Sequence, residues 1–408
     1  MSIELEDNGE YPAQMEPMLP AAGGANRRQL EDLAVDLVAK AHRLAAQLHP
    51  SVRTEVGALV RSMNCYYSNL IEGHNTHPVD IDRALREDYS QNPGKRALQL
   101  EARAHIEVQA MLDGATPDKP PSLGELPASS TFIRGVHAEF CSRLPDDLLW
   151  VVNSASGERI RVVPGELRQR HVKVGRHVPV SPGAVVRFLS RFEAAYRAAD
   201  LSRVEQIIAV PAAHHRLLWI HPFIDGNGRV TGLMSHAMLR DTGIGTSLWS
   251  VSRGLARNDA DYKRLLMAAD EERHGDYDGR GALSEAALTE LCEFFLRVCV
   301  DEVEFMESIL NAGTLLGRIE AWLTEQVTAG ALHQKSFPLI REAFQKGSLE
   351  RGRVPDLTGL GERQARNVLS QLIERGVMAS SGHRSPVRLV FPSEIAERWF
   401  PNLYPSST

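Results

Sequence analysis

Apolar residues recur every three to four positions along most of the chain, which is the spacing of amphipathic helices. A first helix is expected from Leu30 to the break at Pro50. The same spacing predicts further helices at residues 52–71, 79–114, 130–143, 183–198, 203–220, 226–240, 259–273 and 283–310. The expected fold class is therefore mainly α, a helical bundle.

One segment interrupts this helical pattern. Between Leu148 and Val180, apolar and polar residues alternate, with turn residues between the runs. Such alternation predicts short strands and a β-hairpin.

The pattern also divides the chain into domains. Residues 1–27 are rich in proline, glycine and acidic residues without periodicity, which is typical of a flexible tail. A proline-rich linker separates an N-terminal helical region, 28–115, from a central domain, 130–312. In residues 313–400, three predicted helices precede two short strands around a Gly-His-Arg-Ser-Pro turn, which is the order of a winged helix.

Composition is that of a globular protein, with 408 residues, 43% of them hydrophobic and 24% charged, and a net charge of −6. This charge excludes a whole-protein footprint for nucleic acid or membrane, so any such binding must be local. The acidic start differs from a secretory signal and no long apolar stretch occurs, so we expect a cytoplasmic protein without membrane contact. The four cysteines lack a CxxC pair and are expected in the core, not in disulfides or a zinc site.

Residues 221–232, HPFIDGNGRVTG, carry the candidate chemistry. Pro222 disfavours helical backbone at His221, so one helix should end there and another begin at about residue 226. The glycine-asparagine-glycine run 226–228 then lies at a helix N-terminus, where free backbone N–H groups and the helix dipole bind anions. Arg229 adds a guanidinium beside the same place.

A histidine and a carboxylate on the loop before this anion site favour phosphoryl or nucleotidyl transfer. Asp225 can hold Mg²⁺ against phosphates, and His221 can accept the proton of an attacking hydroxyl. The alternative is structural, with both residues capping helices and the glycines forming a tight turn. The number of fixed positions in one string favours the chemical interpretation.

The stretch HPFIDGNGR, from His221 to Arg229, resembles the signature of the Fic (filamentation induced by cAMP) family of the Fic/Doc superfamily, HxFx[DE]GN[GK]RxxR. The stretches TFIRGVHAEFCSRLP, PGELRQRHVKVG, HHRLLWIHPF and ARNDADYKRLLMAAD lie where that family has its leading helix, substrate flap, motif-feeding helix and closing helix. The resemblance covers roughly residues 60 to 310. It implies a Fic-type helical bundle with a β-hairpin flap.

The resemblance also implies an activity, that of a protein adenylyltransferase, a nucleotidyltransferase that moves AMP from ATP to a Ser, Thr or Tyr hydroxyl of a target protein. His221 would be the base and Asp225 the Mg²⁺ ligand. The nucleotide phosphates would be held by Gly226, Asn227, Gly228 and Arg229. Glycine at position 228 favours nucleotidyl transfer, because the phosphotransferase branch that resembles the Doc toxin has lysine there.

Two further contacts follow from the resemblance. The flap edge, formed by Val172, Lys173, Val174 and Gly175, would bind the target segment by strand addition. A purely structural β-ribbon is the alternative. Tyr262 would line the nucleotide base pocket, although an aromatic residue on a helix also fits the core.

The stretch Ser68-Asn-Leu-Ile-Glu72-Gly73 ends the second predicted helix, with Gly73 at its C-cap. Alone it fits a solvated helix face. It resembles the [ST]xxxE[GN] inhibitory motif of Fic proteins, whose glutamate enters the nucleotide site and blocks the productive triphosphate pose. Autoinhibition through Glu72 is therefore expected.

Gly232 stands where the family has its second arginine, which contacts the γ-phosphate and the inhibitory glutamate. Arg240 lies about 12 Å further along the helix and cannot replace it. Three outcomes stay open: AMP transfer with weaker ATP binding, use of another nucleotide donor, or removal of AMP with Glu72 positioning water. A glycine inside a helix costs roughly 1 kcal/mol relative to alanine, which favours close packing or ligand approach at Gly232.

Residues 334–389 contain ten Lys or Arg against five acidic residues, a modest basic patch. A winged helix would present Arg363, Gln364, Arg366 and Asn367 to DNA, while a protein contact is the alternative. The rival function is a DNA-binding regulator that senses a nucleotide without transferring it. The target protein and the oligomeric state stay open, a homodimer included.

Overall fold

The computed structural model describes residues 5–24, 26–116, 123, 126–153, 157–245 and 247–404. The chain forms two compact units, which we describe separately. Unit 1 consists of Met1–Ala39, Asn64–Thr246 and Ser250–Glu302, and unit 2 consists of Lys40–Met63, Ser247–Trp249 and Val303–Thr408.

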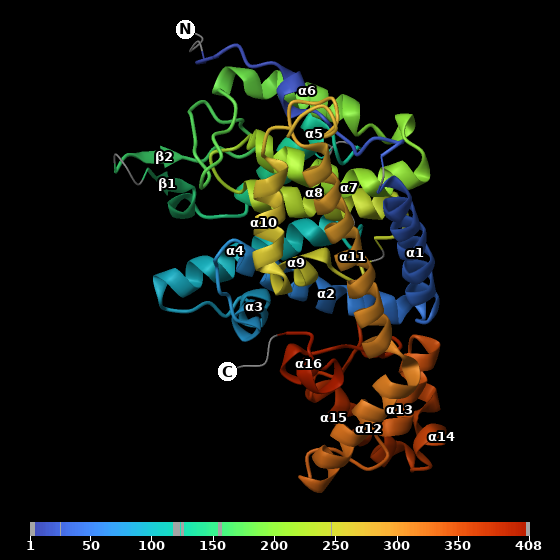
Figure 1. Cartoon of the computed structure of the whole chain (residues 1–408). Helices are drawn as coiled ribbons and strands as arrows, with labels where there is room; N and C mark the ends of the chain where they lie inside the picture. Colours follow the sequence, from blue (N-terminus) through green and yellow to red (C-terminus); the bar gives the residue numbers. More distant parts are fainter. Residues whose placement is uncertain are drawn as a thin grey trace. The chain divides into compact units, whose positions relative to one another are not determined.

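Unit 1 is built around one central helix, α7 (Arg203–Ile220), on which nearly every side chain from Ile207 to Leu217 is buried. Helix α7 packs on α6 (Val185–Ala195) and α8 (Asn227–Asp241), and α8 also contacts α4 (Pro93–Leu112) and α5 (Ser130–Cys141) (Figure 1). The other helices with residues in unit 1 are α1 (Arg27–Ala46), α2 (Pro50–Ile71), α3 (Pro78–Leu85), α9 (Val251–Arg257), α10 (Asp259–Ala269) and α11 (Glu285–Leu310). Short 3₁₀ helices lie at Pro12–Met15, Asp146–Leu148, Pro182–Ala184 and Ala198–Asp200.

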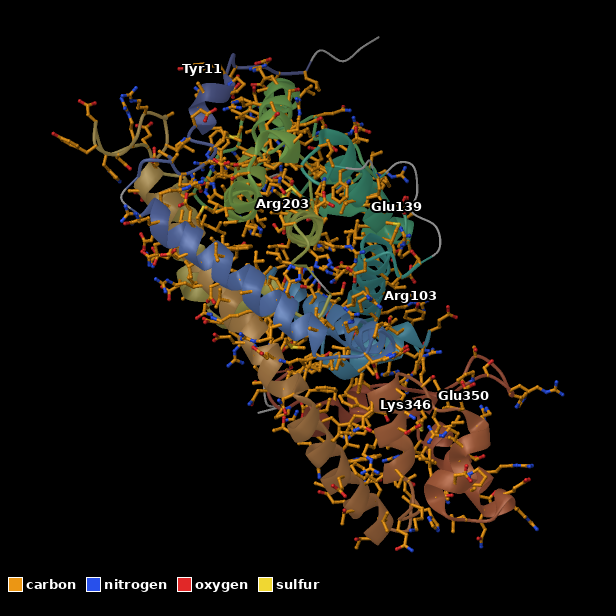
Figure 2. The ribbon with its side chains drawn as sticks, turned by 90° about the vertical axis from the view of Figure 1, so that its right-hand side faces the viewer. Tyr11, Arg103, Glu139, Arg203, Lys346 and Glu350 are labelled. Carbon is orange, nitrogen blue, oxygen red and sulfur yellow. The ribbon has the colours of Figure 1, made fainter. Side chains whose placement is uncertain are left out.

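Charged side chains join α4 to α5 in unit 1 (Figure 2). Arg143 contacts Glu139 at 2.7 Å and Glu107 at 3.3 Å, and Glu107 also pairs with Arg103 at 2.7 Å. These side chains are partly exposed, so each pair adds little stability but helps to fix the helix register.

The predicted β-hairpin is present in unit 1. Strands β1 (Trp150–Val152) and β2 (Arg159–Arg161) pair antiparallel, with Trp150 opposite Arg161. The turn residues 154–156 lie outside the described part of the chain. The following segment, with the PGELRQRHVKVG stretch, is irregular apart from a bridge between Val174 and His177.

The flexible tail predicted at residues 1–27 does not match the packing of the segment from residue 5 to 24. Met15 and Met18 are buried, and the Met18 carbonyl accepts a hydrogen bond from the Tyr196 hydroxyl at 2.7 Å. Glu10 accepts a hydrogen bond from the Ser181 backbone at 2.8 Å, and Asp7 pairs with Arg187. Two methionines and several acidic anchors hold this polar segment, although it has no helical periodicity; residues 1–4 and 25 lie outside the description.

Unit 2 holds α12 (Ala312–Thr328), α13 (Phe337–Lys346), α14 (Val354–Thr358), α15 (Glu362–Glu374), β3 (Met378–Ala379), β4 (Arg388–Leu389) and α16 (Ser393–Trp399), with a 3₁₀ helix at Arg351–Arg353. Met378 pairs with Leu389, and Leu349 forms a bridge with Val387 on the other side of the β4 segment. Helix α16 packs on α12 through Trp399 and Trp322, whose ring centroids are 5.4 Å apart.

The prediction of a mainly α fold is confirmed, and most helix positions agree within a few residues. The helix expected at 79–114 is instead two helices, because the chain turns at Glu87, whose φ is 62°, and Asn92 caps a new helix that begins at Pro93. Within the described residues, no helix is long and apolar enough to cross a membrane. The four cysteines are free and buried.

Candidate active site

The loop between α7 and α8 carries the residues of the HPFIDGNGR stretch. His221 ends α7 in the left-handed region, with φ 50° and ψ 62°, as the following proline requires a departure from helical backbone. The Asn227 amide closes the loop, because its Oδ1 accepts from the Phe223 N–H at 3.0 Å and its Nδ2 donates to the Phe223 carbonyl at 2.9 Å. Gly226, with φ 78°, then caps α8. Helix α8 thus begins at the predicted place.

His221 is held as a neutral imidazole. Burial lowers its pKa to about 4, and the positive charge of Arg168 acts in the same direction. A hydrogen bond between the ring and the Leu218 backbone opposes this shift and orients the ring. A neutral imidazole that donates through one nitrogen keeps a lone pair on the other, so His221 can accept a proton at neutral pH.

Arg168 fixes the loop to the base of the flap, and the sequence motif gave no sign of it. Its side chain is buried and forms no ion pair with a carboxylate of the described residues, and burial lowers its pKa to about 10, with Glu10 acting against the shift. The guanidinium donates to backbone carbonyls, including those of His221 at 2.8 Å and Val180. The Arg168 N–H also donates to the Pro222 carbonyl at 2.9 Å. One residue therefore joins the α7–α8 loop to the segment around Val180.

Helix α5 packs against the α7–α8 loop through His137. The His137 ring stacks on Phe223, with centroids 4.0 Å apart and planes 2° from parallel. His137 Nδ1 accepts the Gly165 N–H at 2.9 Å, and burial lowers its pKa to about 4. His137 is therefore a neutral supporting residue within the TFIRGVHAEF stretch.

The carboxylate of Glu72 occupies the N-terminus of α8. A Cβ placed on Gly228 would overlap Glu72 Oε1, so the carboxylate lies where any side chain at position 228 would begin. Although Glu72 as a residue is exposed, desolvation of its carboxylate raises its pKa, with Arg229 acting against the shift. An internal anion thus lies at the place where the helix dipole and free N–H groups favour an external one.

The predicted inhibitory stretch forms the end of α2. Ser68 is buried, and the Glu72 N–H donates to its carbonyl at 3.3 Å. Gly73, with φ 82°, turns the chain as expected of a C-cap. The structure therefore brings Glu72 and the loop 221–229 together.

Arg229 lies among acidic and aromatic groups. Its Nη1 is 3.2 Å from Glu101 Oε2, and its Nη2 is 3.6 Å from Asp225 Oδ2. The guanidinium carbon lies 4.8 Å from the centre of the Phe140 ring. Neither Glu101 nor Phe140 belongs to the motif, and only their place in the fold identifies them.

Asp225 is suited to an Mg²⁺ ion that is shared with a ligand. Its side chain is about half exposed at the tip of the loop. Among the described residues, no group of three or more His, Cys, Asp or Glu could hold a metal ion by itself. Mg²⁺ needs no such cage, because it is commonly bound by one or two carboxylates together with substrate phosphates and water. The residues present fit this mode.

Gly232 does not lie in a tight place. A Cβ built on it would meet no protein atom within 4 Å, so the expectation of close packing is wrong, while the approach of a ligand stays a prediction. Arg240 points elsewhere, with its Nη1 3.4 Å from Asp113 Oδ1. The helix therefore has room for a side chain at position 232.

The flap edge and Tyr262 have different surroundings. Val172 is partly exposed, while Lys173, Val174 and Gly175 are exposed and turn back through the bridge to His177. Tyr262 is buried, and its hydroxyl lies 2.6 Å from His214 Nε2. This buried, hydrogen-bonded position fits the alternative interpretation of Tyr262 as a core residue.

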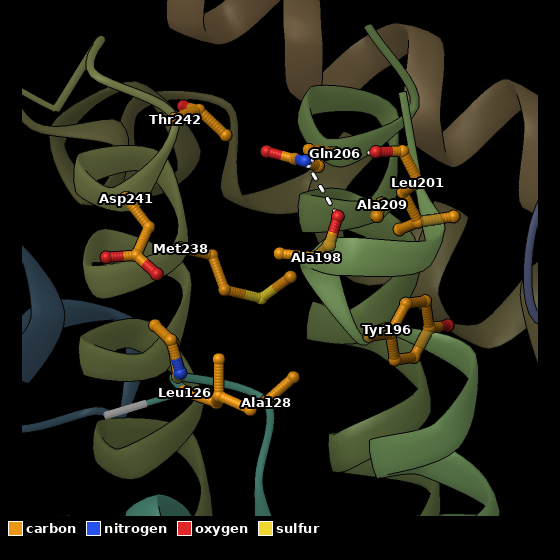
Figure 3. Close-up of a pocket in the computed structure, with 11 residues that line it drawn as sticks. Leu126, Ala128, Tyr196, Ala198, Leu201, Gln206, Ala209, Met238, Asp241 and Thr242 are labelled. Atoms are coloured by element: carbon orange, nitrogen blue, oxygen red, sulfur yellow. Dashed lines mark hydrogen bonds between the residues drawn. The ribbon is translucent and has the colours of Figure 1, made fainter. Parts of the chain in front are cut away.

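A cavity lies between α7 and the C-terminal end of α8, away from the motif loop at the start of that helix (Figure 3). Met238 points into it, and Gln206 at its rim donates to the Ala198 carbonyl at 2.8 Å. Its lining is mostly apolar and contains no anion-binding group, so it is not the phosphate site.

Parts of the chain are similar to known proteins. A family model described as Fic/DOC family matches residues 128–239. Protein adenylyltransferase Fic of Drosophila erecta is 27% identical over 170 residues, 40% of this chain and 34% of that protein. The protein of the same name from Drosophila melanogaster is 26% identical over 170 residues, 40% of this chain and 35% of that protein. The chain spans about a third of the length of these relatives.

Among solved structures, the crystal structure of a Fic family protein from Desulfovibrio desulfuricans G20 has a TM-score of 0.49 and 18% identity; it covers 88% of this chain and 97% of its own. The matched family segment contains α5, α6, α7 and most of α8, the elements that form the loop. Fold and loop define a helical domain in which the motif lies between α7 and the N-terminus of α8. The chain contains a segment that matches the Fic/DOC family, residues 128–239, as its motif predicted.

Proposed function

We propose that this chain is a protein adenylyltransferase that transfers AMP from ATP to a hydroxyl group of a target protein. The observation that carries the proposal is the loop 221–229, in which a partly buried, neutral histidine precedes a helix N-terminus where a carboxylate, that of Glu72, already lies. The names of the Drosophila relatives support the same reaction class.

The proposed reaction is an in-line displacement at the α-phosphorus of ATP. The target hydroxyl oxygen forms a bond to this phosphorus, the bond to the bridging oxygen breaks, and pyrophosphate leaves with its electron pair. His221 accepts the hydroxyl proton. Gly226, Asn227 and Gly228 let the phosphates approach the start of α8, and Arg229 offsets their charge. Bound Mg²⁺, held by Asp225, would neutralise negative charge on the phosphates and the leaving group.

Glu72 would keep this enzyme inactive. Its carboxylate lies against Gly228, so phosphates cannot enter the same space until the end of α2 moves. Two negative groups at one helix N-terminus would also repel each other. Removal of AMP from modified proteins, with Glu72 positioning water, is the alternative role, and Gly232 keeps the choice of nucleotide donor open.

Labelling of the full chain with ATP and Mg²⁺ tests the proposal. With ATP labelled at the α-phosphate, Glu72→Gly should label itself more strongly than the wild type, and adding His221→Ala should reduce the rate roughly 10²- to 10⁴-fold. Intact-mass measurement should show an AMP adduct. Label from the γ-phosphate, or labelling that survives His221→Ala, would refute the assignment.

The winged-helix assignment of residues 313–400 is supported by the order α13, α14, α15 and the strand pair β3–β4, together with the bridge from Leu349 to Val387. Helix α15 exposes Arg363, Gln364, Arg366 and Asn367. Arg366 also pairs with Glu362 at 2.8 Å, which lowers the charge offered to a phosphate backbone. Because α15 exposes these polar side chains, a DNA-binding regulator that senses a nucleotide is the alternative to an enzyme.

A further inference from the structure

Glu101 and the partly exposed His74 have no part in the proposed chemistry, although Glu101 contacts Arg229 directly. Glu101 of α4 presents one oxygen, Oε2, to two partners: Arg229 Nη1 at 3.2 Å and His74 Nδ1 at 3.2 Å. Only 7% of the Arg229 side chain and 15% of the Glu101 side chain are exposed. Because the pair is shielded from water, removal of one partner is costly, since it leaves the other charge buried without compensation.

His74 connects this cluster to the inhibitory glutamate. It follows Glu72 by two residues, in a turn whose backbone is fixed by bonds from the His74 N–H to the Asn69 carbonyl at 2.8 Å and from the Thr76 N–H to the His74 carbonyl at 3.2 Å. The Asn69 amide also donates to Thr76 Oγ1 at 3.3 Å. Because the turn is held as one piece, any backbone movement that carries Glu72 away from Gly228 also moves His74 relative to Glu101.

Charge explains why the cluster opposes nucleotide binding. The Arg229 guanidinium has Glu101 and Asp225 as ion-pair partners and Glu72 near enough to interact. Its Nε is buried and has no hydrogen-bond partner among the described residues. An incoming phosphate must therefore compete with Glu101 for Nη1, and it meets a site in which carboxylates outnumber the one arginine.

We propose that Glu101 is a regulatory positioning residue that holds Arg229 and, through His74, the turn that carries Glu72. Withdrawal of Glu72 and release of Arg229 to the phosphates are then one coupled event. This inference rests on the proposed function, since it concerns regulation of the same nucleotide site. Glu101 itself contacts neither nucleotide nor target.

The test is a double-mutant cycle on the binding of Mg²⁺-ATP to the full chain, measured by calorimetry. Glu101→Gln keeps the size of the side chain and removes its charge, so we expect about tenfold tighter binding. Glu72→Gly should tighten binding as well. Because both changes act on the same inhibitory arrangement, the ATP affinity of the double variant should rise by clearly less than the product of the two single fold-changes.

Two further variants separate regulation from damage to the fold. His74→Gln replaces the imidazole with a neutral amide, which weakens the link to the turn but leaves Glu101 on Arg229, so it should tighten binding even if Glu101→Gln unfolds the protein. Glu107→Gln, on the same helix but paired with Arg103 and Arg143 at the surface, should leave binding unchanged.

The outcomes distinguish this inference from the proposed function. ATP binding that is unchanged or weaker in both Glu101→Gln and His74→Gln overturns the role of Glu101. The role is also overturned if the effects of Glu101→Gln and Glu72→Gly on ATP affinity multiply fully in the double variant. Both outcomes hold whether or not AMP is transferred. Tighter, non-multiplicative binding without any AMP transfer supports the role of Glu101 while it refutes the adenylyltransferase.

Discussion

At the scale of single residues, His221 combines an unusual backbone with an unusual charge state. A left-handed conformation is uncommon for a residue other than glycine and is kept only where the surroundings fix it. Here Pro222 disfavours right-handed helical backbone at His221, and the Arg168 hydrogen bond to the His221 carbonyl helps to fix the conformation that it adopts. The imidazole is thereby held in a buried place that disfavours its charged form.

This charge state gives a prediction for the pH dependence of labelling. Because the pKa of His221 is lowered to about 4, the imidazole of the free enzyme stays neutral as the pH falls from 8 to 5.5, and loses its accepting form only below that range. We expect the initial labelling rate of Glu72→Gly at low ATP, which reports the free enzyme, to show no histidine-like decline in this interval. A half-maximal rate near pH 6.5 would contradict a buried neutral base.

The residues of the site divide by how far they lie in the sequence from the motif. His221, Asp225 and the glycines could be predicted, because their chemistry and spacing occur in one string. Glu101 and Arg168 could not, because each lies more than 50 positions from its motif partner and depends on how α4 and the flap pack. Gly232 shows the reverse: of the two expectations, close packing is wrong, because no protein atom lies near its Cβ position, and ligand approach stays a prediction.

At the scale of elements, helix ends were predicted best where local chemistry determines them. Pro222 and Gly226 set the α7–α8 junction, and the Ser202–Glu205 capping box sets the start of α7. The irregular flap was predicted less well. Alternating residues suggested strands, but only Trp150–Val152 and Arg159–Arg161 pair, while the rest is fixed by Arg168 and by contacts such as that of His177 Nε2 with the Trp219 carbonyl at 2.7 Å.

Arg168 therefore determines how the flap and the α7–α8 loop stay together. Arg168→Met keeps an unbranched side chain but removes every donor, so buried carbonyls of His221 and Val180 lose their partner. We expect a loss of at least about 2 kcal/mol in the free energy of unfolding. Labelling in the Glu72→Gly background should fall as well. Urea denaturation and the labelling assay measure the two effects.

Gly232→Ala is the matched control for this variant. Its added methyl group meets nothing within 4 Å, and alanine favours the helix interior over glycine by roughly 1 kcal/mol. This variant should be neutral or slightly more stable. If Arg168→Met unfolds at the same urea concentration as the wild type, the flap and loop have another anchor.

At the scale of the whole molecule, the sequence suggested a domain boundary near residue 313, but the compact units divide the chain differently. Unit 2 takes residues 40–63, at the junction of α1 and α2, together with everything from Val303 onward. Hydrophobic periodicity along the sequence cannot reveal this division. Helical spacing continues through each of α1, α2 and α11, although each helix contributes residues to both units.

Truncation at the predicted boundary tests this division. A chain of residues 1–312 keeps the 40–63 segment but loses most of the unit that buries it. Leu44, Val56 and Val60 are fully buried in that segment, and Glu55 pairs with Arg388. Each newly exposed aliphatic side chain costs up to about 1.5–3 kcal/mol, so we expect a lower melting temperature and self-association in size-exclusion chromatography. A chain ending at residue 404 is the control. A monomeric 1–312 fragment with an unchanged melting temperature would contradict this expectation. It would mean that residues 40–63 are stable without residues 313–408, and that the boundary predicted near residue 313 separates two independently folding parts.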